Sequence, residues 1–137
     1  MLIGEMSRRT GVKVPTIRYY EGIGLLPAPA RTDGGQRSYD GSHLRRLTFV
    51  RHARELGFEV EAIRQLLDLD AHPERPCDKA DEIARHHLGE VERRIGKLVA
   101  LRSELSRMVE ACSHGTAGEC RVIQVIADHD LCEADRH

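Results

Sequence analysis

Two cysteines close a short loop near the end of this 137-residue chain, and their spacing suits a soft metal ion. Cys112 and Cys120 enclose a segment that contains two glycines and one histidine, His114. Thiolate sulfur and imidazole nitrogen bind zinc, cadmium, lead, mercury or copper(I) in preference to magnesium or calcium. The pattern therefore predicts a metal-binding loop in which Cys112 and Cys120 are ligands and His114 is a candidate fourth ligand.

The chain has two further cysteines, Cys77 and Cys132. A single cysteine such as Cys77, which stands where a long helical pattern begins, is by itself more often a buried apolar side chain than a ligand. Cys132 lies with His129 and His137 in a looser terminal cluster, which we interpret as incidental ligand types rather than a dedicated site. In a reducing compartment the four cysteines are expected to be ligands or free thiols before disulfides.

The composition is that of a small protein of the cytoplasm. With 40% apolar residues and no tryptophan, 137 residues predict one domain or a small domain with an extension. No apolar run approaches the roughly 18 residues of a membrane span, and the N-terminus MLIGEMSRRTGVKV lacks the apolar core of a signal peptide. We therefore expect a cytoplasmic protein with no membrane partner.

Charged residues are distributed unevenly, although the formal net charge is only -1. Residues 1–54 contain ten Lys and Arg against four Asp and Glu, whereas residues 55–137 contain eleven basic and eighteen acidic residues. A basic N-terminal half suits phosphate binding, and an acidic C-terminal half would be repelled by nucleic acid. On charge alone, a solvated surface without such a partner stays open.

The N-terminal residues predict two short helices around a turn. Residues 3–10 form an amphipathic pattern that ends before Gly11, a residue type favoured after a helix. A second helix follows, with Pro15 in its first turn and Ile17 facing the first helix. This is a helix-turn-helix pattern. Its outward polar residues, which we expect to reach a DNA groove or backbone, are Thr16, Arg18 and Tyr20.

A hairpin and two more helices are predicted next. An Asp-Gly-Gly turn sequence between Arg31 and Arg37 predicts a β-hairpin wing. Asp40 or Ser42 can cap a third helix, which ends at Gly57. A fourth short helix is closed by a proline-containing break.

A long helix is predicted from residue 78 to about residue 111, where no proline occurs. Its apolar residues follow alternating steps of three and four, the spacing of a coiled-coil seam. They are Leu88, Val91, Ile95, Leu98, Leu105, Val109 and Cys112, interrupted by Arg102. Such a helix is about 50 Å long at ~1.5 Å per residue and cannot bury this stripe alone. We predict dimerisation through the seam, with packing against the N-terminal half as the alternative.

These motifs resemble the MerR family of metal-responsive transcriptional regulators across essentially the whole chain. The resemblance rests on Ile3-Gly4-Glu5, Thr16-Ile17-Arg18-Tyr19-Tyr20-Glu21, Gly24-Leu25-Leu26, Arg37-Ser38-Tyr39, Leu66-Leu67, Cys77, and the loop from Cys112 to Cys120. It implies a mostly α-helical fold: a winged helix-turn-helix DNA-binding domain in 1–75, a dimerisation helix in 76–111 that forms an antiparallel coiled coil, and a metal-binding loop and tail in 112–137. It also implies that Cys77 of one subunit completes a site with Cys112 and Cys120 of its partner.

The resemblance further implies a function. A homodimer would bind double-stranded promoter DNA whose two polymerase-recognition elements are too far apart and rotationally misaligned. Metal binding would make the dimer untwist and kink the DNA, so that RNA polymerase engages both elements and activates metal-resistance or efflux genes. Arg18 and Tyr20 match the family's recognition helix, Arg37 and Tyr39 match its wing, and Arg31 and Arg51 are weaker candidates. The alternative for Tyr19 or Tyr20 is a place largely in the core.

Formal charge favours a divalent ion, although the Cys112–Cys120 spacing resembles the family's copper(I) sensors, which usually carry serine in place of Cys77. Three thiolates around a divalent ion leave one negative charge, whereas three around copper(I) leave two in a site that excludes water. We therefore expect zinc first, with cadmium, lead or mercury as related ligands. A copper(I) or silver sensor and a thiol redox sensor of the same fold remain alternatives. We expect no enzyme, because no nucleophile–base arrangement or phosphate loop is present.

Overall fold

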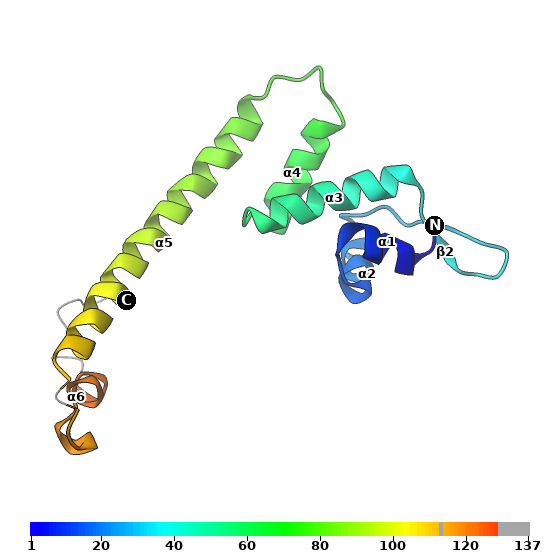
Figure 1. The fold of residues 1–137 in the computed structure, drawn as a ribbon. Helices are drawn as coiled ribbons and strands as arrows, with labels where there is room; N and C mark the ends of the chain where they lie inside the picture. The colour runs from blue at the N-terminus through cyan, green and yellow to red at the C-terminus, as the bar shows by residue number, and fades with distance from the viewer. Residues whose placement is uncertain (113, 129–137) are drawn as a thin grey trace. The chain divides into compact units, whose positions relative to one another are not determined.

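The structure, a computed structural model, describes residues 1–112 and 114–128. They are mostly helical, as predicted, with short helices and a hairpin before one long helix (Figure 1). They form two compact units, residues 1–87 and the residues from Leu88 onward. In these described ranges no helix combines the length and the apolar character that a membrane crossing requires.

Helix α1 (Ile3–Thr10) and helix α2 (Val14–Gly22) form the predicted helix-turn-helix. Gly11 follows α1 with φ 74°, a left-handed conformation that favours glycine. Pro15 lies in the first turn of α2, where its missing N–H costs no helical hydrogen bond. Met6 of α1 and Ile17 of α2 are fully buried, so the two helices pack through their apolar faces.

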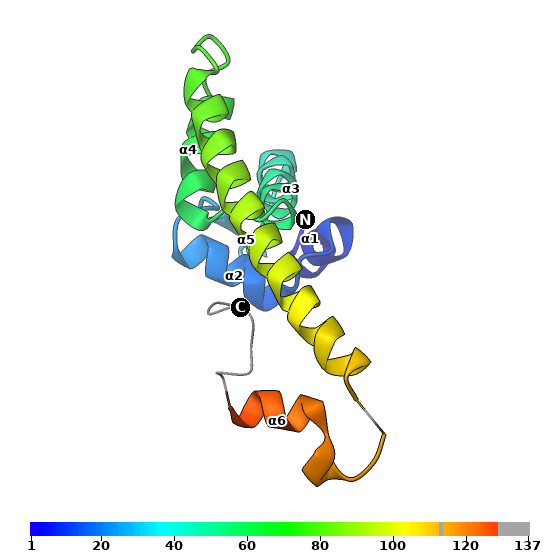
Figure 2. The same ribbon diagram turned by 90° about the vertical axis from the view of Figure 1, so that its left-hand side faces the viewer.

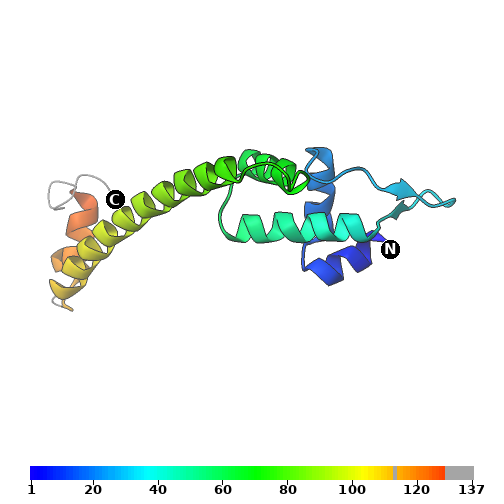
Figure 3. The same cartoon turned by 90° about the horizontal axis from the view of Figure 1, so that it is seen from above.

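Strand β1 (Ala30–Arg31) and strand β2 (Arg37–Ser38) form the predicted hairpin. The strands are antiparallel, with Arg31 opposite Arg37. Gly35 closes the turn with φ 81°, a conformation that residues with a Cβ rarely adopt. Figure 3 shows the two strands extending outward from one end of the first unit.

Helix α3 (Gly41–Glu55) begins at the predicted cap, Asp40. The Asp40 carboxylate accepts hydrogen bonds from the N–H groups of Ser42 at 2.9 Å and His43 at 3.1 Å. The Ser42 hydroxyl also donates to this carboxylate and has the largest effect on it. Together these hydrogen bonds hold the pKa of Asp40 well below its usual range. After Gly57, helix α4 (Val60–Asp70) completes the short helices that precede α5.

One core holds these elements together. Helix α3 contacts both α1 and α4. The fully buried side chains come from every helix of this half and from the segments beside the hairpin: Met6, Ile17, Leu25, Leu26, Tyr39, Leu47, Val50 and Ile63. Because α2 and the hairpin are anchored in the same core, their outer surfaces are fixed relative to each other.

Helix α5 runs from Asp78 to Glu110 and carries the predicted apolar seam. In the described chain this seam is largely uncovered. The side chains that are more than half exposed are Leu88, Ile95, Leu98, Leu105 and Val109. Exposed apolar stripes of this length and regularity are typical of helices that pair in coiled coils.

Between the end of α5 and residue 128 lie two short helical segments that were not predicted from the sequence. A 3₁₀ turn, η1 (Ala117–Glu119), leads into helix α6 (Arg121–Ala127), shown in orange to red in Figure 2. Val125 of α6 is buried and lines one cavity with the buried Met108 of α5, so α6 packs on the last turns of α5. The β-branched run of α6 has weak helix propensity, and packing rather than local preference forms this helix.

Candidate DNA-binding groove and metal-binding loop

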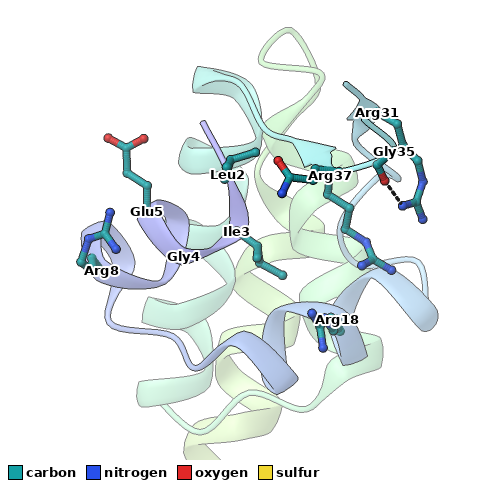
Figure 4. Close-up of a pocket in the computed structure, with 10 residues that line it drawn as sticks. Leu2, Ile3, Gly4, Glu5, Arg8, Arg18, Arg31, Gly35 and Arg37 are labelled. Atoms are coloured by element: carbon teal, nitrogen blue, oxygen red, sulfur yellow. Dashed lines mark hydrogen bonds between the residues drawn. The ribbon is translucent and has the colours of Figure 1, made fainter. Parts of the chain in front are cut away.

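An open groove of about 580 Å³ lies between the start of α1, helix α2 and the hairpin (Figure 4). Four arginines line it: Arg8 from α1, Arg18 from α2, and Arg31 and Arg37 from the strands. Among the described residues around the groove, Glu5 is the only carboxylate. This excess of guanidinium groups suits DNA phosphates and the acceptor atoms of base edges.

The groove brings together Arg18 and Arg37, which were predicted to contact DNA, and Arg31, a weaker candidate. Arg8 was missed. The excess of basic residues in 1–54 was its only signal, because nothing in the local sequence of α1 shows that its first turns lie beside α2 and the hairpin.

Glu21 at the end of α2 holds the hairpin in place. The Tyr39 hydroxyl donates to one Glu21 oxygen, and Arg37 Nε lies 3.2 Å from the other. Burial raises the pKa of Tyr39, and the hydrogen bond and charge of Glu21 raise it further against the opposing effects of Arg37 and Arg18. The phenol therefore stays neutral and acts as a hydrogen-bond donor, which ties the second strand to α2.

The tyrosines of α2 lie differently from their prediction. Tyr20 was expected to point outward with Thr16 and Arg18, but it is only 8% exposed and belongs to the core. Tyr19 is 57% exposed instead. Tyr20 follows Ile17 by three residues, so the two share the buried helical face. Thr16 is half-buried and Arg18 is exposed.

Tyr39, predicted to contact DNA from the wing, is also buried, at 2% exposure. Besides its bond to Glu21, its ring makes an edge contact with His43, with ring centroids 5.4 Å apart. The structure therefore places Tyr39 beneath the hairpin rather than on its surface.

Three other arginines are directed at the protein backbone. Arg51 of α3 donates to the carbonyl oxygen of Thr10 at the end of α1, and Arg46 Nε donates to Leu25 O at 2.6 Å. Arg64 of α4 donates to the carbonyl that follows α2, at residue 23. Arg51, a weaker candidate for DNA contact, is thus engaged in fixing α1 onto α3, a role with no sequence signal.

Cys112 and Cys120 stand at the two ends of the loop between α5 and α6. The backbone N–H groups of Ile123 and Val122 and the Cys112 thiol act on Cys120 as hydrogen-bond donors that favour its thiolate. These bonds, above all the one from Ile123, hold the pKa of Cys120 below its usual value, although partial burial opposes them. Of the predicted pair, Cys120 is therefore biased toward the thiolate form that binds metal, and its role as a ligand stays a prediction.

The remaining predicted ligands do not join this pair. Cys77 is exposed and directly precedes α5, whereas Cys112 follows the end of that helix. His114 is exposed with φ 56°. Within residues 1–112 and 114–128, no group of three or more His, Cys, Asp or Glu side chains could hold a metal ion. The looser terminal cluster, His129, Cys132 and His137, lies outside the described residues.

Comparisons with known proteins agree with this arrangement. Residues 1–70 match the family described as MerR HTH family regulatory protein, and residues 44–108 match the one described as MerR, DNA binding. The HTH-type transcriptional regulator ZntR of Escherichia coli K12 is 41% identical over 128 residues, covering 90% of each chain. Heavy metal-dependent transcription regulator 2 of Rhizobium meliloti is 37% identical, covering 93% of this chain and 87% of that relative.

A solved structure is similar over nearly the whole chain. It is the crystal structure of the transcription regulator PbrR691 from Ralstonia metallidurans CH34 in complex with lead(II). It superposes with a TM-score of 0.79 at 37% sequence identity, covering 92% of this chain and 98% of that one. The family match over half of the sequence, the full-length relatives and the shared fold lead to one conclusion: this chain belongs to the MerR HTH family of regulatory proteins.

Proposed function

We propose that this protein is a metal-responsive activator of transcription that acts as a homodimer on double-stranded promoter DNA with RNA polymerase. Residues 1–75 bind DNA, residues 76–111 form the dimerisation helix, and residues 112–137 hold the metal loop and tail. A divalent soft ion, zinc first and otherwise cadmium, lead or mercury, is bound by three thiolates. These are Cys112 and Cys120 of one subunit and Cys77 of the partner subunit, with His114 as a candidate fourth ligand.

The observation that carries this proposal is that Cys112 and Cys120 stand at the two ends of the loop between α5 and α6, with the Cys112 thiol among the groups that lower the pKa of Cys120. Two converging sulfurs are the donor set of a soft metal. In its own chain, Cys77 is separated from them by the 33 residues of α5, about 50 Å of helix. We therefore infer that Cys77 joins the pair from a second copy. The lead(II) complex of PbrR691 and the heavy metal-dependent regulator of Rhizobium meliloti support the class of ion.

The arginine-lined groove supports the DNA-binding part of the proposal. Arg18 on α2 and Arg37 on the hairpin face the same space, so one helix and one wing can contact neighbouring parts of a duplex. Arg8 extends the basic surface along α1. Most such arginine contacts go to phosphates and set position, and a minority specify bases.

Ligands shared between subunits explain how metal could change transcription. Thiolates on the loop of one subunit and at the start of α5 of the other would bind metal more tightly in one dimer conformation, which shifts the population toward it. Bending a DNA site costs of order 1–6 kcal/mol. Structural zinc sites contribute about 10–16 kcal/mol. A fraction of that binding free energy is therefore enough to offset the cost of bending the DNA.

Serine substitutions in the loop test the metal site. Cys112→Ser and Cys120→Ser should each abolish induction by zinc, cadmium, lead or mercury, because each removes one thiolate and one bond between subunits. Metal-free promoter binding should stay within about twofold, since the loop is not part of the arginine groove. Promoter gel shifts and transcription in vitro measure both, with Cys132→Ser as the control cysteine. Full metal induction of either loop variant would overturn the proposed site.

Copper(I) is the second candidate effector, favoured by the observation that only two thiols converge among the described residues of one chain. The variant Cys77→Ser separates the two ions. If three thiolates bind a divalent ion, this variant loses the zinc response and its preference shifts toward copper(I), for which two thiolates suffice. If the wild type responds only to copper(I) or silver and Cys77→Ser leaves that response unchanged, the divalent assignment is wrong.

A further inference from the structure

His87 connects the first turns of α5 to the turn between α3 and α4. Its Nε2 lies 2.7 Å from the carbonyl oxygen of Leu56. A carbonyl oxygen only accepts, so the hydrogen bond assigns the proton to Nε2. The imidazole also packs on the ring of Phe58, with centroids 4.6 Å apart and the planes inclined by 37°. One side chain of α5 thus contacts both ends of the turn Leu56-Gly57-Phe58.

Gly57 makes this close approach feasible. It has φ 89°, and a Cβ placed there would lie 3.0 Å from His87 Nε2 and 3.2 Å from Cε1. A larger residue would therefore push the imidazole away from the turn, besides being strained by the backbone conformation. The turn and His87 fit each other closely, and neither belongs to the arginine groove or the metal loop.

From this turn, contacts continue to the groove. Phe58 packs against the buried core, and its N–H donates to Ala53 O of α3 at 3.1 Å. Helix α3 carries Arg51 and α4 carries Arg64, whose guanidinium groups hold the carbonyls at the ends of α1 and α2. Through α3 and α4, the turn is thus connected to α1 and α2, the helices that carry the DNA-facing Arg8 and Arg18.

We propose that His87 is the positioning residue through which α5 controls the DNA-binding unit. The inference rests on the proposed function, because it takes Cys77 as the metal ligand. Cys77 directly precedes α5, and His87 follows it within three turns of that helix. A displacement of these turns by thiolate bonds across the dimer is passed to α3 and α4 through His87, along an unbroken series of packed groups.

The test compares His87→Ala with His86→Ala, its exposed neighbour on α5, in the full-length protein. In the absence of metal, hydrogen exchange of the amides in 56–58 and 78–87 should rise in His87→Ala and stay unchanged in His86→Ala. Metal-free promoter affinity and zinc affinity, the latter from competition with a chelator, should stay within about twofold. Zinc-dependent transcription should fall by about tenfold or more, within the range of ordinary allosteric coupling.

The conservative variant His87→Gln keeps an N–H donor at a similar distance and should restore part of the zinc response. Unchanged hydrogen exchange in His87→Ala would overturn the inference whatever the metal response. Equal losses of zinc affinity, promoter affinity and induction would also overturn it, since they would show a merely structural role. A wild type that ignores all the metals instead rejects the proposed function, while the exchange measurement still decides whether His87 joins α5 to the turn.

Discussion

Glu21 holds two neighbouring side chains beside the arginine-lined groove. One carboxylate oxygen accepts from the Tyr39 hydroxyl and the other pairs with Arg37 at 3.2 Å. The Glu21 side chain is only 11% exposed, so solvent screens this pair less than an ordinary surface ion pair. The buried tyrosine therefore supports the hairpin from within, and Arg37 is held where it faces the groove.

The first prediction concerns Tyr39→Phe, which removes the hydrogen bond to Glu21 and should lower the free energy of unfolding by about 1 kcal/mol at pH 7. Burial and Glu21 raise the pKa of Tyr39 above its unfolded value of about 10. Its contribution is thus fully present below pH ~10 and is lost as the pH rises through the folded pKa. The stability difference between wild type and variant should be constant from about pH 7 to 9 and shrink above ~10.

Urea unfolding at a series of pH values measures this difference. Tyr19→Phe is the matched control, because Tyr19 is largely exposed, and it should change stability little at any of these pH values. A difference between wild type and Tyr39→Phe that grows above pH ~10 would contradict the assigned role of the phenol.

The sequence alone identified basic positions that line the groove, but it did not show which tyrosines are buried. The basic positions Arg18 and Arg37 were found, since charge and turn signals mark them. Tyr19 and Tyr20 are adjacent and chemically identical, so only the rotation of α2 about Ile17 decides which one is buried. Tyr39 was misplaced for a similar reason, because its partner Glu21 is distant in sequence.

At the scale of elements, the groove is built by pieces that are each too small to be stable alone. The hairpin strands contain two residues each, and α2 has nine. Arg46 and Arg64 brace the segment after α2 by donating to its carbonyls, in addition to the shared core. The turns and helices of this half could be predicted from glycine, proline and apolar spacing, whereas these long-range arginine–carbonyl contacts leave no local pattern.

The second prediction tests the groove that these elements form. Arg18→Ala and Arg37→Ala should each weaken promoter binding and leave metal affinity unchanged, because both guanidinium groups line the groove. Loss of one phosphate contact should reduce the slope of log K against log salt by about one unit. Binding isotherms at several salt concentrations give this slope.

Arg93→Ala is the matched control, since this exposed arginine lies on α5. Its slope should equal that of the wild type. If Arg18→Ala and Arg37→Ala bind as tightly as the wild type at every salt concentration, DNA binds elsewhere on the protein.

At the scale of the whole molecule, α5 carries a surface that the described chain does not cover. The seam was predictable because a heptad spacing maintained over many turns is a strong signal. Helix α6 was not, because its short β-branched run has no such period, and the burial of Val125 against α5 accounts for it. The shared three-thiolate site we propose depends on what covers the seam, since it takes Cys77 from the partner subunit.

The third prediction therefore concerns Ile95→Glu and Leu98→Glu. Both side chains are more than half exposed in the single chain, and each would be buried twice in a homodimer. Burying such a side chain is worth about 1.5–3 kcal/mol, so losing two should raise the dimer dissociation constant by at least ~100-fold. Lys97→Glu is the control, because it introduces the same carboxylate on α5 outside the seam, and it should leave the dimer intact.

Sedimentation at one protein concentration, with circular dichroism to check helicity, measures the outcome. We expect monomers or aggregates for Ile95→Glu and Leu98→Glu, because an unpaired carboxylate in apolar packing is costly. The same variants should lose zinc-dependent transcription, since monomers cannot bring Cys77 of the partner subunit to Cys112 and Cys120. Intact dimers for both variants would show that the seam is not the dimer interface, and a three-thiolate site shared across it would fail with it.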